Sequence, residues 1–256
     1  MGKAMPATPA WPPRSAPRLF VTDELDAGRS LSLDGQQAHY LAKVMRAKTD
    51  DIVILCDNRT GEWAARVTQA DRRRVDVDVI EQLRPLEAVP DLWLCPALLK
   101  KDRFDWVLEK ATELGAAQIR PVLTRRCVAD KLNAERAQTI MTEAAEQCAR
   151  TALPALSAPV SLEAMLRDWP ADRTLYFADE KGGEPAARAF AAGGPGAAIL
   201  IGPEGGFDDH ERAMLRAHPQ VKTISLGPRI LRGETAGIAA LSLWMGTAGD
   251  WNGTAA

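Results

Sequence analysis

From residue 91 almost to the end of the chain, short apolar runs alternate with longer segments of helical periodicity. The apolar runs predict strands at 92–98, 118–124, 173–179, 197–202 and 221–227. Helices are predicted at 102–115, 134–152 and 234–248, with Asp102 as the N-cap of the first and Gly115 at its end. Strands that alternate with helices form parallel sheets covered on both faces, so this feature predicts an α/β domain over 91–249.

Residues 18–84 follow a different pattern. Strands are predicted at 18–21, 51–56, 62–70 and 75–80, and the spacing of apolar residues predicts a helix at 35–47. The segment VDVDVI alternates as a strand with one buried face does. These elements predict a small β-barrel over 18–84. We interpret 85–90, with a proline at each end, as a linker, and 1–17 and 250–256 as tails.

Composition excludes several classes of protein. The net charge of −2 argues against a uniformly basic nucleic-acid binder, so any contact with RNA must use local basic clusters. The four cysteines lie far apart without a Cys-x-x-Cys pair, and the three histidines show no metal spacing, so no disulfide framework or metal site is expected. No apolar run approaches the roughly 20 residues that span a bilayer, and no export signal is recognisable. We therefore expect a cytoplasmic protein.

Two predicted strands run into Gly-Pro loops, LIGPEGGF at 200–207 and LGPRILRGETA at 226–236. In open parallel sheets, ligands bind beyond the carboxyl ends of the strands, and glycine lets the backbone approach a ligand closely. Ordinary turns remain an alternative for each loop taken alone. The loops lack the G-x-G-x-x-G, P-loop and G-x-S-x-G patterns, which disfavours dinucleotide binding, phosphate cradling and serine hydrolysis. Asp208 and Asp209 are predicted to open a helix after the first loop.

Together, LIGPEGGF and LGPRILRGETA resemble the signature of the RsmE family of 16S rRNA uridine methyltransferases, which belong to the SPOUT class. RLFV, HYLAKVMRAKTDDIVILCDNRTGEWAARV, FDWVLEKATELGAAQIRPVLTRRC and EAAEQCARTALP are similar to further family segments in the same order. The resemblance covers nearly the whole chain from Arg18 onward. The chain departs from the family at Ala149, where glycine is usual, and at Gly233, where a larger residue is common.

The resemblance implies a PUA-like RNA-binding barrel, a SPOUT domain with a trefoil knot, a homodimer, and S-adenosylmethionine as cofactor. The substrate would be the uridine numbered 1498 in 16S rRNA, methylated at N3 in the small subunit. The residues expected to contact the cofactor are Phe177, Ala178, Leu200, Ile201, Gly202, Pro203, Glu204, Gly205, Leu226, Gly227, Ile230, Leu231 and Ala236.

A guanidinium would stabilise the negative charge that uracil develops when its N3 loses a proton, and we expect Arg232 in this role. Glu234 is expected to orient Arg232 or accept a hydrogen bond, and Thr235 to cap the last helix or contact substrate; both also suit a simple helix start. No general base is recognisable. RNA contacts are expected from Arg18, Arg46, Arg72, Arg73, Arg74 and Arg229. The apolar residues Leu241, Leu243, Trp244 and Met245 of the last helix could form a dimer face, and a buried core helix would have the same pattern.

Three other functions stay open on the sequence. The same fold can methylate ribose 2′-oxygens, although the N-terminal barrel and the second loop favour the base-methylating family. A non-catalytic RNA-binding protein would not bind S-adenosylmethionine. A nucleotide-dependent oxidoreductase is disfavoured by the missing fingerprint, and NAD should leave the protein's stability unchanged.

Overall fold

The structure is a computed structural model that describes residues 11–194 and 196–252. The chain forms two compact units. The N-terminal unit contains the chain up to Glu87 together with the short segment Ala149–Ala152. The C-terminal unit contains Ala88–Cys148 and the chain from Leu153 onward. Over the described ranges, no helix is long and apolar enough to cross a membrane.

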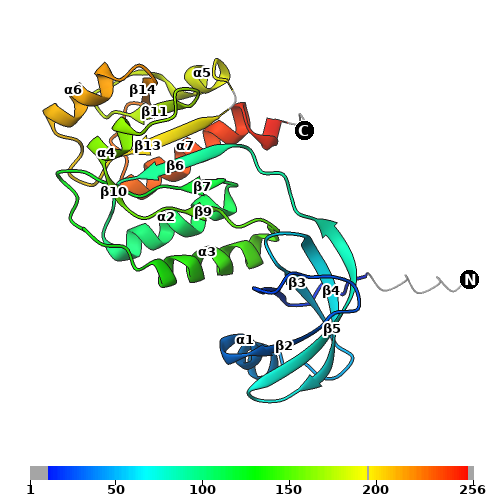
Figure 1. Ribbon diagram of the computed structural model, residues 1–256. Helices are drawn as coiled ribbons and strands as arrows, with labels where there is room; N and C mark the ends of the chain where they lie inside the picture. The colour runs from blue at the N-terminus through cyan, green and yellow to red at the C-terminus, as the bar shows by residue number, and fades with distance from the viewer. Residues whose placement is uncertain (1–10, 195, 253–256) are drawn as a thin grey trace, which may run out of the picture. The chain divides into compact units, whose positions relative to one another are not determined.

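A five-stranded sheet with the order β1-β3-β4-β5-β2 forms the N-terminal unit (Figure 1). Strand β1 pairs in parallel with β3, and the other neighbours are antiparallel. The alternation in β5 buries Val75, Val77 and Val79 in the core of the unit. The elements are β1 (Arg18–Phe20), β2 (Ser30–Asp34), α1 (Gly35–His39), a π-helix (Tyr40–Val44), β3 (Ile52–Cys56), β4 (Gly61–Ala70) and β5 (Arg74–Pro85).

Three expectations for this unit change. The sheet curls over its core, but in the described residues no pairing joins the edge strands β1 and β2, so it is not a closed barrel. The helix expected at 35–47 is α-helical only to His39 and continues as the π-helix. Residues 1–10 and 253–256 of the expected tails lie outside the described residues, whereas Trp11 donates a hydrogen bond to Glu81 and Asp250–Asn252 forms a 3-10 helix.

The C-terminal unit contains a seven-stranded parallel sheet with the order β12-β14-β11-β13-β6-β7-β9, as the alternation of elements predicts. Strands β8 and β10 form a separate parallel pair. The strands are β6 (Leu92–Pro96), β7 (Gln118–Ile119), β8 (Val122–Leu123), β9 (Ala155–Leu156), β10 (Val160–Ser161), β11 (Thr174–Ala178), β12 (Glu184–Pro185), β13 (Ala197–Ile201) and β14 (Val221–Ser225). The helices are α2 (Lys101–Glu113), α3 (Ala134–Cys148), α4 (Leu162–Arg167), α5 (Ala186–Ala191), α6 (Asp209–Ala217) and α7 (Gly233–Thr247).

Helices cover both faces of this sheet (Figure 1). On one face, α2, α3, α5 and α7 share a core with alternate residues of the central strands, such as Ile199 and Tyr176. On the other face, α4 and α6 pack over Leu175, Phe177 and Leu200. Because the central strands are covered on both sides, only the strand ends and their loops are open to ligands.

Four local expectations for this unit are wrong. The strand expected at 118–124 is two strands, because Pro121 has no N–H to continue a ladder and the chain changes partner there. The helix expected to reach residue 152 ends at Cys148, after which Ala149 has φ +62°. Lys100, not Asp102, precedes α2 as its N-cap. Leu241, Trp244 and Met245 are buried in the core of the unit, so the expected dimer face on α7 is a core face.

Candidate active site

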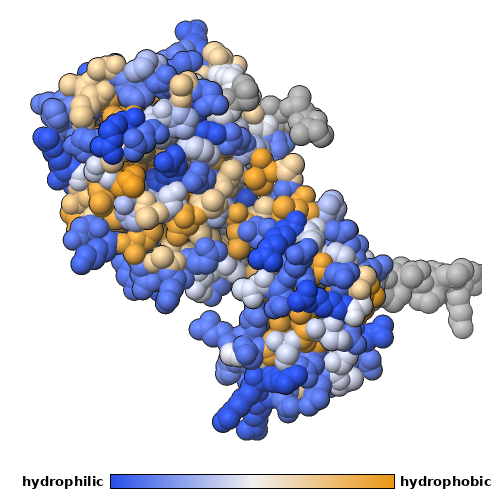
Figure 2. Space-filling model, in the orientation of Figure 1, coloured by the Kyte–Doolittle hydropathy of each residue, from blue (hydrophilic) through white to orange (hydrophobic). Residues whose placement is uncertain are grey.

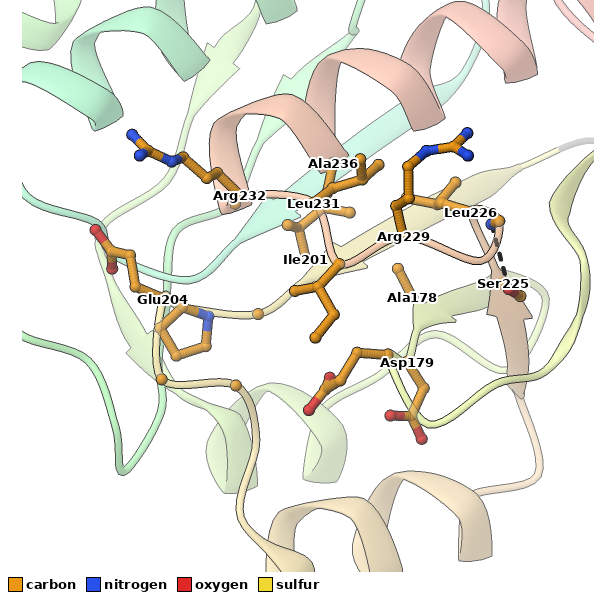
Figure 3. A pocket seen from close by; sticks show the side chains of 18 of the residues that line it. Ala178, Asp179, Ile201, Glu204, Ser225, Leu226, Arg229, Leu231, Arg232 and Ala236 are labelled. Carbon is orange, nitrogen blue, oxygen red and sulfur yellow. Dashed lines mark hydrogen bonds between the residues drawn. The ribbon is translucent and has the colours of Figure 1, made fainter.

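A cavity of about 410 Å³ lies at the carboxyl ends of the neighbouring strands β11, β13 and β14 (Figure 3). This is the edge of a parallel sheet at which ligands bind, and the volume is typical of a small-molecule site. The cavity is lined by Arg103, residues 178–180, 201–206 and 225–233, and Ala236.

One wall of the cavity is apolar and closely packed. Ala178, Ile201, Leu226 and Leu231 face it from the three strand ends and the second loop (Figure 3). At Gly202 an added Cβ would lie 2.7 Å from a ring carbon of the buried Phe207, so no side chain fits there. The small residues therefore bring the main chain itself to the surface of the cavity.

A buried ion network forms the acidic side. Asp179, whose side chain is fully buried, accepts hydrogen bonds from Arg212 Nε at 3.2 Å and from Arg216 at 2.7 Å. The Arg212 guanidinium also donates to the Phe207 carbonyl and to Glu180. Burial alone would lower the pKa of Arg212, but the hydrogen bond to Asp179 and the charge of Glu180 raise it above its ordinary value. The Arg212 guanidinium is therefore held in place and charged at neutral pH.

The rim carries a second set of charges. Arg103, from the first turn of α2, donates to Glu204 at 3.2 Å and lies 3.8 Å from Glu234. Glu234 is only 7% exposed, and its Oε2 has no hydrogen-bond partner among the described residues. A buried carboxylate oxygen without a hydrogen-bond partner lowers the stability of the fold. The Glu234 side chain is therefore held in place by the surrounding structure and not by hydrogen bonds of its own.

The loop 202–207 is held in place by the start of α6. Asp208 is the N-cap of α6 and forms a capping box with Glu211, as expected from the acidic pair that follows the loop. The backbone N–H of Glu211 lowers the pKa of Asp208 by its hydrogen bond. Arg125 donates through its backbone to Glu211 at 2.8 Å, and Arg126 donates to the Gly205 carbonyl at 2.9 Å. These contacts give the glycine-rich loop one conformation.

Most residues expected to contact a cofactor line the cavity, but two do not. Phe177 and Leu200 are fully buried in the core beneath it, where Phe177 packs edge-on against Phe207. The residues from that set that line the cavity are Ala178, Ile201, Gly202, Pro203, Glu204, Gly205, Leu226, Gly227, Ile230, Leu231 and Ala236.

The expected catalytic residues lie at the start of α7. Arg232 lines the cavity at its rim, is exposed, and points to the same side as Glu204 in Figure 3. Thr235 is exposed in the first helical turn and does not line the cavity. The N-cap of α7 is Arg232 and makes no side-chain cap hydrogen bond, so the expected capping by Thr235 is wrong.

The arginines expected to contact RNA lie in both units. Arg18 pairs with the buried Glu62 at 3.1 Å, and Arg46 is exposed. Arg72, Arg73 and Arg74 are exposed around the β4–β5 turn, in a unit whose lower end in Figure 2 shows mostly hydrophilic side chains. Arg229 lines the cavity of the C-terminal unit. Contact with RNA stays a prediction for all six.

Several lining residues were not predicted from the sequence: Arg103, Glu180, Gly206, Ser225 and Gly233. A signal existed for the first two. Asp179 and Glu180 directly follow β11, the central neighbour of β13 and β14, and Arg103 follows β6 on the other side of β13. Charged residues just beyond adjacent parallel strands are candidates for a shared site.

Two families of RNA methyltransferase domains match this chain. The RNA methyltransferase domain matches residues 87–245, and the RNA methyltransferase PUA domain matches 33–80. Ribosomal RNA small subunit methyltransferase E of Bacillus subtilis is 30% identical, over 88% of this chain and 94% of its own. The Synechocystis protein of the same name is 32% identical, over 88% of this chain and 76% of its own.

Two solved structures have the same fold with a TM-score of 0.84, and both cover 92% of this chain and 99% of their own. One is a Legionella pneumophila methyltransferase, 29% identical, in complex with bound S-adenosylmethionine. The other is the small subunit methyltransferase E of Neisseria gonorrhoeae, 25% identical and bound to S-adenosylmethionine.

The fold and the matched domains place the chain among RNA methyltransferases with an appended PUA domain. Within that class, the relatives that match along most of its length share one name. The chain belongs to the RsmE family of the SPOUT class.

Proposed function

We propose that the chain transfers a methyl group from S-adenosylmethionine to N3 of the uridine numbered 1498 in 16S rRNA of the small ribosomal subunit. The observation that carries the proposal is the cavity at the ends of β11, β13 and β14. It occurs in a fold whose Legionella and Neisseria relatives are described with this cofactor bound. The family supports the rRNA substrate, and the cytoplasm, where ribosomes are assembled, is the proposed place of action.

The residues of the cavity fit this cofactor. Gly227 has φ +110°, a conformation that side chains disfavour, and has open space where a side chain would stand. Gly202, whose Cβ position is filled by the Phe207 ring, lines the cavity beside Ile201. We propose that backbone groups at 201–202 and 226–231 hold the adenine and ribose. Phe177 and Leu200 support these loops from the core and make no direct contact.

When bound, S-adenosylmethionine supplies a methyl group attached to a positively charged sulfur. Methyl transfer is an in-line displacement, so the chain contributes mainly by aligning the acceptor nitrogen. Loss of the N3 proton places negative charge on the uracil carbonyl oxygens. The exposed Arg232 guanidinium at the rim is suited to stabilise that charge with fixed N–H donors.

Glu234 is proposed as a positioning residue. Its carboxylate is buried beside Arg103, which also binds Glu204 at the rim. Glu234 helps to hold the Arg103 side chain, and Arg103 in turn holds Glu204. Glu204 lies on the side of the cavity to which Arg232 points in Figure 3. For Thr235, which is exposed, we propose only that it lies near the bound RNA.

The N-terminal unit is proposed to grip the surrounding RNA through its exposed arginines, and the target uridine to be turned out of its stack. We also propose the homodimer and the trefoil knot of the family. The main chain after β14 passes the end of β13 where α7 begins, because a Cβ added at Gly233, the first residue of α7, would lie 3.2 Å from the Gly202 carbonyl oxygen. This close approach supports a knot at 226–233, against the general rule that chains do not thread loops.

The test is transfer of labelled methyl groups from S-adenosylmethionine to small subunits from a strain that lacks this protein. The modified nucleoside is identified by mass spectrometry. We expect N3-methyluridine, and a loss of rate on the order of 10²- to 10³-fold in Arg232→Ala, because a donor to developing charge is removed. Arg188→Ala, an exposed arginine on α5, is the matched control and should keep full rate.

Other outcomes reject distinct parts of the proposal. Label on a ribose would keep the methyltransferase and replace the target. Neither transfer nor cofactor binding would favour a non-catalytic RNA-binding protein. Stabilisation by NAD would favour an oxidoreductase.

A further inference from the structure

Glu180 differs from the other acids around the cavity. It directly follows Asp179 at the end of β11 and lines the cavity, and its side chain is 39% exposed whereas that of Asp179 is fully buried. Its Oε1 accepts a hydrogen bond from Arg212, and Oε2 has no hydrogen bond to the described residues. Glu180 therefore offers a free acceptor oxygen to whatever occupies the cavity.

The carboxylate is held rigidly. Arg212, itself only 6% exposed in its side chain, binds Asp179, the Phe207 carbonyl and Glu180 at once. A buried guanidinium with three acceptors cannot rotate away without leaving charges unpaired. Glu180 is thus positioned before any ligand arrives, which lowers the entropic cost of binding.

The first loop leaves room for this carboxylate. Gly206 has φ +65°, and an added Cβ there would lie 2.8 Å from Glu180 Oε1 and 3.6 Å from Arg212. Any larger residue at 206 would push the carboxylate from its place. The end of β11 and the distant segment formed by the glycine-rich loop and the following α6 therefore cooperate to present one acid to the cavity.

We propose that Glu180 binds the ribose hydroxyls of the cofactor and makes the site specific for an intact ribose. The inference rests on the proposed function. The aliphatic wall around Leu226 and Leu231 suits the flat adenine, and the Arg103 guanidinium at the rim suits the methionine carboxylate. In Figure 3 the acidic wall at Asp179 lies between Leu226 on one side and Arg232 with Glu204 on the other. The ribose lies between adenine and methionine in the cofactor, and its two hydroxyls are donors that match a carboxylate.

The experiment measures binding by calorimetry, without any methyl transfer. The ligands are S-adenosylhomocysteine, its 2′-deoxy and 3′-deoxy analogues, and 5′-methylthioadenosine, which keeps the ribose but lacks the amino acid. The proteins are wild type, Glu180→Gln, Glu180→Ala and the control Glu163→Ala, an exposed acid on α4. None of these ligands carries the sulfonium charge, so simple attraction between Glu180 and a cation at sulfur is removed from the comparison.

For Glu180→Ala we expect about 10- to 100-fold weaker binding of S-adenosylhomocysteine and of 5′-methylthioadenosine, the loss typical of a hydrogen bond to a charged group. Glu180→Gln should lose less, and the deoxy analogues should lose less than about threefold in either variant. Each variant is its own folding control, because a misfolded site would lose all ligands equally.

Equal losses for the deoxy analogues, losses confined to ligands that carry the amino acid, or no loss at all would each overturn the role of Glu180. Failure of wild type to bind S-adenosylhomocysteine would instead reject the proposed function itself.

Discussion

Ala149 occupies a backbone conformation that suits glycine. It follows the last residue of α3 with φ +62°, where a Cβ is strained, and its carbonyl accepts a hydrogen bond from Arg84 at 2.8 Å. The chain thus keeps the local geometry of a glycine C-cap without the glycine that usually supplies it.

Replacement of Ala149 by Gly should therefore stabilise the protein. We expect a gain of about 0.5–1 kcal/mol in the free energy of unfolding, the relief of strain minus the extra freedom of glycine in the unfolded chain. The same change at Ala213, exposed within α6, should cost about 1 kcal/mol because helical glycine is unfavourable. Chemical denaturation measures both, and destabilisation by Ala149→Gly would contradict the φ value.

The four cysteines should differ sharply in reactivity. Burial raises the pKa of Cys95 to about 12, and burial with the nearby Glu62 carboxylate raises that of Cys56 to about 12, whereas Cys148 is exposed. Because the thiolate is the reactive form, brief alkylation of the native protein at pH 8 should label Cys148 and leave Cys56 and Cys95 unlabelled. Mass spectrometry after short pulses at pH 8 and pH 9.5 tests this. Labelling of Cys95 as fast as in denaturant would contradict its burial.

At the residue scale, the sequence predicted the loops better than the walls. The Gly-Pro loops were recognisable as sequence motifs, whereas the roles of Glu180 and Arg103 depend on which strands are neighbours. Sheet order is a long-range property that no local pattern contains. The burial of Phe177 and Leu200 beneath the cavity was missed for the same reason.

At the scale of elements, the start of α7 depends on a pair of residues. Gly233, its first residue, is so close to Leu99 that an added Cβ would lie 3.0 Å from a methyl carbon and 3.2 Å from the Gly202 carbonyl oxygen. Leu99 is 3% exposed. The chain therefore has a leucine in the space that a larger residue at 233 would need.

Gly233→Thr should destabilise the protein, because the new side chain would clash with Leu99. Leu99→Ala should remove part of that clash and so recover part of the lost stability. Leu99→Ala alone should cost about 2–5 kcal/mol, but the double variant should be more stable than the sum of the two changes by at least about 1 kcal/mol. Leu175→Ala, on the opposite face of the sheet, should add to Gly233→Thr without coupling. Additivity of the Leu99 pair in the same denaturation experiment would contradict the contact.

Element type followed from the sequence where elements are long and regular. The alternation of β5 and the helical period of α2 were sufficient to predict them. Strands of two residues, such as β7 and β12, and six-residue helices, such as α4 and α5, are too short to show a period. The π-helix at Tyr40–Val44 has a sequence typical of an α-helix, but its backbone hydrogen bonds are spaced more widely. The periodicity of apolar residues does not reveal that change.

At the scale of the molecule, segment Ala149–Ala152 returns to the N-terminal unit after α3. Glu87 accepts hydrogen bonds from the backbone of Thr151 and Ala152 and lies 3.4 Å from Arg150. No linker signal marks this segment in the sequence, because its place depends on contacts between residues more than sixty positions apart.

The net charge of −2 means that RNA binding must depend on a few cations. Replacing Arg72, Arg73 and Arg74 together by alanine should weaken binding to 16S rRNA fragments and reduce the slope of log K against log salt by about one to two units. Three lost contacts set the upper limit, and Arg74 is already partly engaged with Asp76 at 2.8 Å. Fluorescence titrations across a salt series measure the slope. Arg167→Ala on α4 is the control, and an unchanged slope in the triple variant would exclude this cluster from the interface.

The proposed activity is tested most directly by the N3-methyluridine content at position 1498 of 16S rRNA from cells. Mass spectrometry of the rRNA fragment compares a strain without this protein with strains that carry wild type, Arg188→Ala or Arg232→Ala in its place. We predict that the modification is absent without the protein, is restored by wild type and by Arg188→Ala, and is not restored by Arg232→Ala. Persistence of N3-methyluridine in the strain without the protein, or restoration of a different methylated nucleoside by wild type, would contradict it.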